Sequence, residues 1–220
     1  AKALVICTDV AQRSPIESAE GEISQGAGAV AMIVSSNPRV LHIENGAFGL
    51  YGNEVQDACR PEAGIETADP ELSLISYLQA AESSFLNYKL KFPASDFQDS
   101  FSYLAFHTPF GGMVKGTHRS LLRKFKGLTP AEIEADFEKR LKPSLTYCQE
   151  VGNLYSGALY LALAGMIEAI DSVSEPTKVG LFSYGSGCSS EFYSGFIGHE
   201  SKKVLESMQI KRNLEERVEI

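Results

Sequence analysis

The chain has 220 residues, enough for one well-buried core or two small ones, and its 44% hydrophobic and 22% charged residues are ordinary for a soluble globular protein. The formal net charge of −8 argues against broad nucleic-acid binding, and no apolar run approaches the ~20 residues that span a bilayer. The chain opens directly on the apolar residues 3–7 with no visible signal peptide, so we expect a fragment that begins inside a fold.

Four cysteines, Cys7, Cys59, Cys148 and Cys188, are scattered without C-x-x-C spacing. This arrangement predicts no zinc site, and no other metal centre is expected. Because each cysteine is beside apolar or small residues, we expect buried free thiols in a reducing cytosol.

The first third of the chain is predicted to consist mainly of strands. Residues 2–8 and 26–34 are apolar enough for buried strands, and residues 40–43 for a third. Residues 14–22 are polar and loop-like, and residues 51–70 lack a clear period, which predicts an extended loop.

The remainder alternates predicted helices and strands, which indicates an α/β fold with both sheet faces covered. The first helix is the clearest, because Leu72, Ile75 and Leu78 recur at helical spacing and Asp69 can cap it. In chain order we expect a helix over 71–89, a strand over 101–106, helices over 114–125, 130–147 and 153–170, strands over 179–184 and 191–197, and a polar helical segment after residue 199.

His107 is the first candidate for chemistry, because it ends the apolar run 101–106 and is followed by Pro109, Phe110 and a glycine pair. The carboxyl ends of strands line the active-site crevice of α/β enzymes. A histidine at a strand end can equally be a structural residue with its hydrogen bonds satisfied. The residues alone leave these two interpretations balanced.

Asn153 and Ser186 are the next candidates. Asn153 precedes a long apolar helix, so it can serve as the N-cap or direct its amide at a substrate carbonyl. Ser186 lies between two glycines, where exposed backbone N–H groups can form an oxyanion hole. This segment is not a G-x-S-x-G nucleophile elbow, because Tyr184 and Cys188 occupy the required glycine positions.

A basic stripe follows His107 on the predicted helix over 114–125. Lys115, Arg119 and Arg123 are spaced i, i+4, i+8 and therefore share one helix face. The stripe is either a solvated face or a docking surface for a phosphate or an acidic carrier beside the active-site mouth. Its basic neighbours in the sequence are His118, Lys124 and Lys126.

Four ordered segments, residues 25–32, 106–110, 151–157 and 181–187, together resemble the 3-hydroxy-3-methylglutaryl (HMG) synthases of the thiolase superfamily. The resemblance covers nearly all of the chain. It implies a thiolase-like fold with α-β-α-β-α layers, present here as a fragment without the N-terminal part.

By this resemblance, residues 1–64 are the end of the N-terminal thiolase-like half and residues 65–220 the C-terminal half. The nucleophilic cysteine and the general acid/base glutamate of the family lie upstream of the segment that matches Ala1. None of the four cysteines takes the nucleophile's place, so we expect this chain alone to be inactive.

The resemblance implies an acyltransferase that joins an acetyl group to the ketone of a β-ketoacyl thioester by an aldol-type condensation and then hydrolyses the enzyme-bound thioester. His107 matches the histidine that binds and polarises the acceptor, and Asn153 matches the asparagine that supports it. Ser186 matches the position whose backbone N–H stabilises the acetyl oxygen. The expected neighbours in the substrate and carrier site are Pro109, Phe110 and Tyr155.

Residues 72–78, 106–116 and 186–192 are most similar to the polyketide branch, which installs β-branches on chains tethered to acyl carrier proteins. Members that use coenzyme A usually carry a lysine at the position of Gly112. We expect no resident cofactor, phosphopantetheine or coenzyme A as substrate carrier, donor and acceptor carrier proteins as partners, a cytoplasmic homodimer, and no nucleic-acid or membrane partner. We hypothesise that the carrier docks on the basic stripe.

Three alternatives remain open. An HMG-CoA synthase of the mevalonate pathway has the same motifs, although Gly112 argues against it. A non-catalytic thiolase-like scaffold could bind acyl carriers. A β-ketoacyl synthase of the same fold is not excluded by His107 and Asn153, although the segments from Gln25 and Ser183 fit HMG synthases better.

Overall fold

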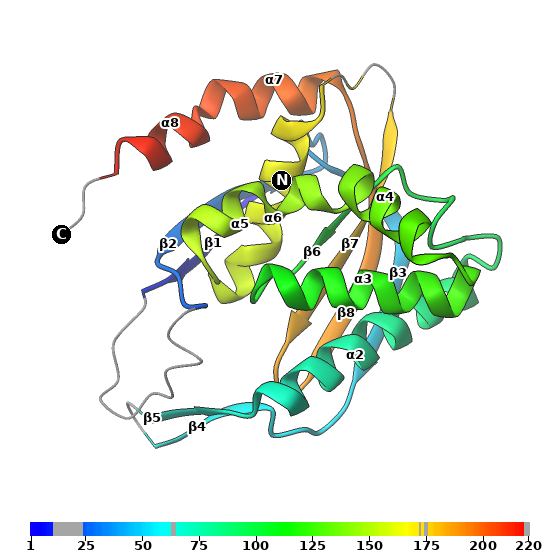
Figure 1. The fold of residues 1–220 in the computed structure, drawn as a ribbon. Helices are drawn as coiled ribbons and strands as arrows, with labels where there is room; N and C mark the ends of the chain where they lie inside the picture. The colour runs from blue at the N-terminus through cyan, green and yellow to red at the C-terminus, as the bar shows by residue number, and fades with distance from the viewer. Residues whose placement is uncertain (11–23, 63–64, 172, 174–175, 218–220) are drawn as a thin grey trace.

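The computed structural model describes residues 1–10, 24–62, 65–171, 173 and 176–217, so the predicted polar loop at 14–22 lies outside the described residues. A four-stranded mixed sheet forms the centre, in the order β3-β8-β7-β6 (Figure 1). β6 runs parallel to β7, whereas β7 with β8 and β8 with β3 are antiparallel. These strands are β3 (His42–Gly52), β6 (Tyr103–Phe106), β7 (Thr177–Gly185) and β8 (Ser189–Ile197).

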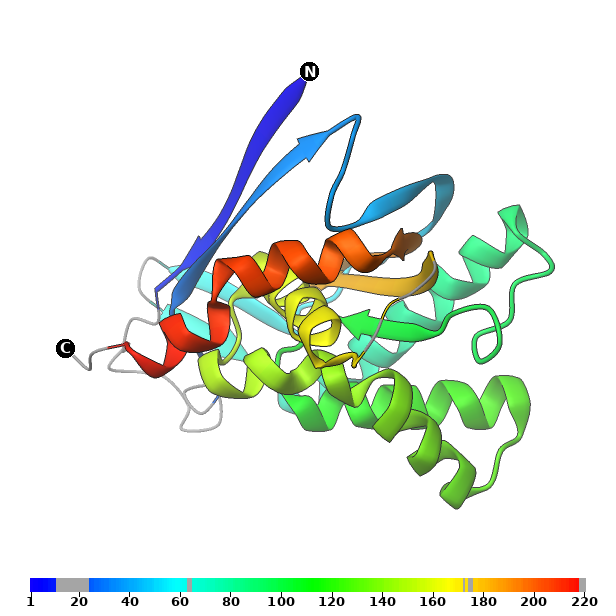
Figure 2. The same cartoon turned by 90° about the horizontal axis from the view of Figure 1, so that it is seen from above.

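Helices cover both faces of this sheet, which confirms the predicted α/β class (Figures 1 and 2). α2 (Pro70–Lys91) and α3 (Gly111–Lys126) lie on one face. α6 (Ala158–Ala169) packs on the other face with α7 (His199–Met208) beside it. Because successive side chains of a strand point to opposite faces, Phe182 joins the core under α2 and its neighbour Leu181 joins the core under α6.

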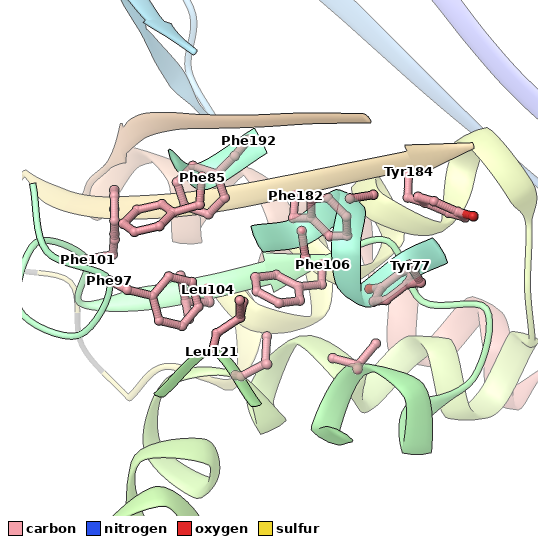
Figure 3. Packing of buried hydrophobic residues seen from close by; sticks show 14 of the residues in the cluster. Tyr77, Phe85, Phe97, Phe101, Leu104, Phe106, Leu121, Phe182, Tyr184 and Phe192 are labelled. Atoms are coloured by element: carbon pink, nitrogen blue, oxygen red, sulfur yellow. The ribbon is translucent and has the colours of Figure 1, made fainter. Parts of the chain in front are cut away.

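Aromatic rings fill the core between the sheet and α2 (Figure 3). Phe85 of α2 lies edge-on to Phe192 of β8, with 5.1 Å between ring centroids, and also contacts Phe97 and Phe101. β3 approaches the same helix so closely that a Cβ on Gly49 would fall 2.1 Å from the backbone nitrogen of Tyr88. Glycine is therefore required at this strand–helix contact.

The predicted helix over 71–89 is confirmed as α2, whose N-cap Asp69 accepts a hydrogen bond from the Leu72 N–H at 3.0 Å. The helix predicted over 114–125 begins earlier, at Gly111, so the glycine pair forms the first turn of α3 rather than a loop. The chain past residue 199 is helical as expected, in α7 and α8 (Ile210–Glu215).

Two other helix predictions were wrong in their extent. The single helix expected over 130–147 is divided into α4 (Pro130–Arg140), a 3₁₀ turn at Lys142–Leu145 and α5 (Thr146–Val151). Pro143 explains the break, because proline lacks an N–H and disfavours helical geometry in the residue before it. The helix expected from residue 153 starts instead with a 3₁₀ turn at Tyr155–Gly157, and α6 follows.

The prediction of an extended loop over 51–70 was also wrong. β3 continues to Gly52, and an antiparallel hairpin of β4 (Ala58–Glu62) and β5 (Ile65–Ala68) occupies much of the rest. The expected division between residues 64 and 65 falls between these two strands, and β3 pairs with β8 across it.

β1 (Lys2–Asp9) and β2 (Gly28–Ser35) form a separate two-stranded antiparallel sheet that extends away from the four-stranded sheet (Figure 2). These strands were expected to be buried, yet Leu4 is 65% exposed and Ile33 is 67% exposed. The exposure arises because the elements described here leave most of this hairpin uncovered.

The four cysteines are free thiols, and Cys148 and Cys188 are buried as expected. Cys7 is only partly buried and Cys59 is exposed, so the prediction of burial was wrong for Cys59. Across the described residues, no helix combines the length and apolar character needed to cross a membrane, and no cluster of potential metal ligands occurs.

Candidate functional site

His107 follows β6 directly and is buried at the carboxyl end of the strand, with 7% of its surface exposed. Its backbone N–H donates to the Phe182 carbonyl at 2.8 Å, which continues the pairing of β6 with β7. Its carbonyl accepts a hydrogen bond from the Tyr77 hydroxyl at 2.6 Å. The backbone of His107 is thus fixed from both β7 and α2.

The imidazole of His107 is neutral at physiological pH. Burial lowers its pKa to about 4, and a hydrogen bond with the backbone of Tyr155 opposes that shift. A neutral imidazole offers one N–H donor and one acceptor nitrogen. Such a group can polarise a carbonyl oxygen through its N–H without bringing a positive charge into the site.

Asn153 is held by the segment that begins at Ser24. The Asn153 N–H donates to the Ser24 carbonyl at 2.8 Å, and the Gly26 N–H donates to the Asn153 carbonyl at 3.0 Å. A Cβ on Gly26 would fall 2.4 Å from the Val151 carbonyl oxygen, so only glycine permits this approach. The structure thereby joins the first and third of the four sequence segments.

The side chain of Asn153 does not cap α6, so the N-cap role, one of the two that the sequence left open, is not the one that the structure shows. The residue that precedes α6 is Gly157, which provides no side-chain cap. Instead, Asn153 Oδ1 accepts a hydrogen bond from the Tyr155 N–H at 2.9 Å. Because the backbone of Tyr155 bonds to the His107 ring, Asn153 orders the segment that contacts His107.

Ser186 lies in the exposed turn between β7 and β8. Residues 53–57 support this turn: the Val55 N–H donates to the Gly187 carbonyl at 2.7 Å, and the Cys188 N–H donates to the Asn53 carbonyl at 2.6 Å. Asp57 Oδ1 accepts the Gly187 N–H at 3.0 Å. The backbone around Ser186 is therefore rigidly placed.

Asp57 also fixes Tyr184, whose hydroxyl donates to Asp57 Oδ2 at 2.7 Å. Burial and this bond to a carboxylate raise the pKa of Tyr184 well above its usual value, so the phenol stays protonated. The rings of Tyr184 and His107 have centroids 6.3 Å apart, and Tyr77 packs edge-on against Tyr184 and Phe182 (Figure 3). Asp57 thus links the Ser186 turn to the surroundings of His107.

Sequence reasoning missed Asp57 and Tyr77. Asp57 is completely buried, and its partners Tyr184 and Gly187 are 127 and 130 residues away in the chain. Nothing near Asp57 in the sequence indicates such partners. Tyr77 lies among the apolar residues of a predicted helix, where a tyrosine is unremarkable until its hydroxyl is located.

The two other aromatic residues expected in the site, Phe110 and Tyr155, are partly exposed. Phe110 is 50% exposed and immediately precedes α3, and Tyr155 is 38% exposed. Pro109, which precedes Phe110 in the chain, is partly buried. Thr108 is buried, and its hydroxyl donates to the Phe106 carbonyl at 2.8 Å.

The two buried thiols are poor nucleophiles. Burial raises the pKa of Cys148 to about 11, and burial also raises the pKa of Cys188. The thiolate rather than the thiol attacks a thioester. The expectation that no cysteine of this chain is the nucleophile agrees with this chemistry.

The basic stripe is partly neutralised within the protein. Lys115 pairs with Glu134 at 2.6 Å, and His118 is completely buried beside Asp136 rather than on the surface. Arg119 and Arg123 are exposed, and neither has an ion pair among the described residues. The lysines near the end of α3 are also paired: Lys124 with Glu82, and Lys126 with Asp96 and Asp99.

Comparison with known proteins points to one family. Residues 119–220 match the family described as hydroxymethylglutaryl-coenzyme A synthase C terminal. The whole chain is 46% identical to the Bacillus subtilis polyketide biosynthesis 3-hydroxy-3-methylglutaryl-ACP synthase PksG and covers 54% of it. An Enterococcus faecalis hydroxymethylglutaryl-CoA synthase is 37% identical over 88% of this chain and 49% of its own length.

Among solved structures, the curacin biosynthetic pathway HMG synthase in complex with acetyl donor-ACP superposes with a TM-score of 0.96 and 46% sequence identity. The match covers all of this chain and 53% of that protein. The chain therefore spans about half the length of the relatives that it matches.

Proposed function

Because the chain belongs to the hydroxymethylglutaryl-CoA synthase C-terminal family, we propose that it forms part of an HMG synthase-type acyltransferase that acts on acyl carrier proteins. The complete protein condenses an acetyl group with the ketone of a β-ketoacyl thioester and so installs a β-branch on a polyketide chain. The observation that carries this proposal is the buried, neutral His107, which bonds to Phe182 and to the Tyr155 backbone from two of the other segments. The remaining segment is joined to this group because Gly26 bonds to Asn153.

In this proposal the acceptor's carbonyl oxygen replaces the Tyr155 backbone as the partner of the one ring N–H of His107, and this hydrogen bond makes the ketone carbon more electrophilic. The acetyl enolate carbon then attacks the ketone carbon, so the new C–C bond forms as the C=O π bond of the ketone breaks. The general acid glutamate, which lies outside this chain, gives the ketone oxygen its proton. Asn153 acts through Tyr155 by ordering the backbone that holds the imidazole. The Ser186 N–H, in its rigid turn, stabilises the acetyl oxygen.

The nucleophilic cysteine and the general acid/base glutamate come, in this proposal, from a part of the protein outside the chain. Residues 1–64 and 65–220 then belong to the two thiolase-like halves. We also propose a cytoplasmic homodimer, and the four free thiols are compatible with a reducing compartment.

The sequence identities support an acceptor that is bound to a carrier protein rather than to coenzyme A. The chain is 46% identical to a synthase named for ACP and 37% identical to one named for coenzyme A. Gly112 contributes no charge for the nucleotide phosphates of coenzyme A, which a carrier-bound phosphopantetheine lacks. Arg119 and Arg123, which form no ion pair with any residue that the structure describes, offer an acidic carrier a docking surface.

The test uses the complete protein with an acetyl-carrier donor and either acetoacetyl-carrier or acetoacetyl-CoA, with products followed by intact mass. We expect an HMG-type adduct on the carrier-bound acceptor only. Efficient turnover of acetoacetyl-CoA with acetyl-CoA would instead place the protein with the HMG-CoA synthases. Carrier binding without any adduct would indicate a non-catalytic scaffold.

A further inference from the structure

The side chain of Tyr77 reaches from α2 to the backbone of His107. Its hydroxyl donates a hydrogen bond to the His107 carbonyl oxygen at 2.6 Å, and Tyr77 is completely buried. Burial raises the pKa of Tyr77 well above its usual value, so the hydroxyl stays protonated and remains a donor. A buried tyrosine hydroxyl needs a partner, and here that partner is the backbone of the residue that carries the candidate catalytic ring.

His107 lies where the chain leaves the sheet. The pairing of β6 with β7 ends at Phe106, and the His107 N–H still donates to the Phe182 carbonyl at 2.8 Å. Thr108 then turns the chain back, with its hydroxyl bonded to the Phe106 carbonyl. The sheet therefore holds the N–H side of His107, and Tyr77 holds the carbonyl side. Because the backbone on both sides of Cα sets the direction of Cβ, these two bonds together direct the imidazole.

The ring of Tyr77 is itself held in place (Figure 3). It packs edge-on against Phe182 and Tyr184, with centroid distances of 5.1 and 5.2 Å. Phe182 is also the residue whose carbonyl accepts the His107 N–H. One residue of β7 thus contacts both the ring of Tyr77 and the N–H of His107, so the three residues form a closed set of contacts.

We propose that Tyr77 is a positioning residue for the condensation step, and that it directs the His107 imidazole toward the acceptor through its bond to the His107 carbonyl. This inference rests on the proposed function, in which the acceptor's oxygen replaces the Tyr155 backbone as the partner of the ring N–H. After that replacement, the ring depends on the backbone of His107 for its position. Transfer of the acetyl group to the nucleophilic cysteine does not use His107 in the proposed function, so that step is independent of the Tyr77 hydroxyl.

The test measures the two half-reactions of the complete protein separately in the wild type, in Tyr77→Phe and in the matched control Tyr88→Phe. Intact mass follows acetyl-enzyme formation from an acetyl-carrier donor. Condensation is then started in a single turnover by adding acetoacetyl-carrier to the acetylated protein. Tyr88 lies on the same helix and is equally buried, but its hydroxyl shares a hydrogen bond with Ser194 Oγ at 2.9 Å rather than with His107.

We expect Tyr77→Phe to slow condensation about ten- to hundredfold, because a small displacement of a positioned group has a large effect on rate. Acetyl-enzyme formation and the Kd of the acceptor should stay within about twofold of the wild type, because the bond from His107 strengthens only as charge develops on the ketone oxygen. Tyr88→Phe should leave both half-reactions close to those of the wild type. Tyr77→4-aminophenylalanine keeps an N–H donor at the same place on the ring and should restore condensation.

Condensation by Tyr77→Phe at the wild-type rate would overturn the inference. So would equal slowing of both half-reactions, the same selective loss in Tyr88→Phe, or no recovery with 4-aminophenylalanine. The proposed function fails by a different result, a wild type that forms no acetyl-enzyme or no HMG-type adduct, and the inference then falls with it. The two failures are distinguishable because only the second is seen in the wild type.

Discussion

At the scale of single residues, the burial of His107 makes the stability of the protein depend on pH. Its pKa is about 4 in the folded protein and 6.5 in the unfolded chain, so the unfolded chain binds the proton more readily between these values. The contribution of His107 to the free energy of unfolding is therefore fully present above about pH 6.5 and is lost as the pH falls toward 4.

We expect urea unfolding at pH 5 and pH 7 to show a loss of about 2 kcal/mol at the lower pH that is attributable to His107. His107→Asn should lack this component, because the asparagine side chain does not titrate. Parallel pH profiles for the wild type and the variant would refute the assignment of the lowered pKa to burial of this side chain.

The second prediction at this scale concerns Asp57, which accepts hydrogen bonds from Tyr184 and Gly187 through different carboxylate oxygens. Asp57→Asn keeps the shape but replaces one acceptor by an amide NH₂, which leaves one buried donor without a partner. We expect a loss of about 1–3 kcal/mol in the free energy of unfolding. Asp69→Asn is the matched control, because asparagine also caps a helix well.

If Asp57→Asn and Asp69→Asn have the same free energy of unfolding, the prediction is contradicted.

Asp57 also illustrates why the candidate site was only partly predictable from the sequence. His107 was identifiable because a histidine at the end of an apolar strand is a local pattern, whereas the partners of Asp57 are brought to it by the pairing of distant segments. The bond of Asn153 to Tyr155 was likewise not predictable, because it depends on how the surrounding residues fold.

At the scale of elements, the contact between β3 and α2 depends on one glycine. A methyl group on Gly49 would overlap the backbone of Ser84 and Tyr88, and a backbone cannot move aside as a flexible side chain can. Gly49→Ala should therefore destabilise the protein by about 3 kcal/mol or more, at the upper end of overpacking effects. Thermal unfolding measures this, with Gly52→Ala as the control on the same strand.

At Gly52 the added methyl would meet only the Cys188 carbonyl oxygen, at 3.6 Å, so the control should be nearly neutral. Similar unfolding temperatures for the two variants would mean that β3 can shift away from α2.

The contact also shows a limit of prediction from sequence. α2 was located well because its cap and period are local, whereas most of β3 was missed because its partner β8 is distant in the chain. β4 and β5 pair with each other, and they were missed because residues 51–70 show no clear alternating period.

The second element-scale question is carrier docking on α3. The paired lysines leave Arg119 and Arg123 as its exposed cations without ion pairs among the described residues. In the complete protein, the double reversal Arg119→Glu with Arg123→Glu should weaken carrier binding about tenfold or more at low salt, and less at high salt where charges are screened. Titration of a labelled holo-carrier measures the affinity.

A matched double reversal of Lys203 and Lys211, on α7 and α8, changes the net charge equally at a different surface. It should leave carrier affinity close to that of the wild type. Unchanged affinity of the Arg119 and Arg123 variant at low salt would eliminate α3 as the docking surface.

At the scale of the whole molecule, the hairpin of β1 and β2 is the least protected part of the described chain. Leu4 and Ile6 on β1 are 65% and 59% exposed, and Ile33 and Val34 on β2 are 67% and 56% exposed. Exposed apolar residues occur side by side along both strands, so both faces of the hairpin are uncovered. Contiguous apolar surface of this kind drives association in water.

We therefore expect the 220-residue chain to self-associate as its concentration rises, which light scattering coupled to size-exclusion chromatography would detect. Leu4→Lys with Ile33→Lys should suppress the association, because each places a charge on the uncovered hairpin. Leu74→Lys, a change at an exposed leucine of α2, should not. The prediction is contradicted if the wild-type chain stays monomeric at all concentrations. It is also contradicted if the hairpin variant associates as strongly as Leu74→Lys, because the hairpin is then not the surface through which the chains associate.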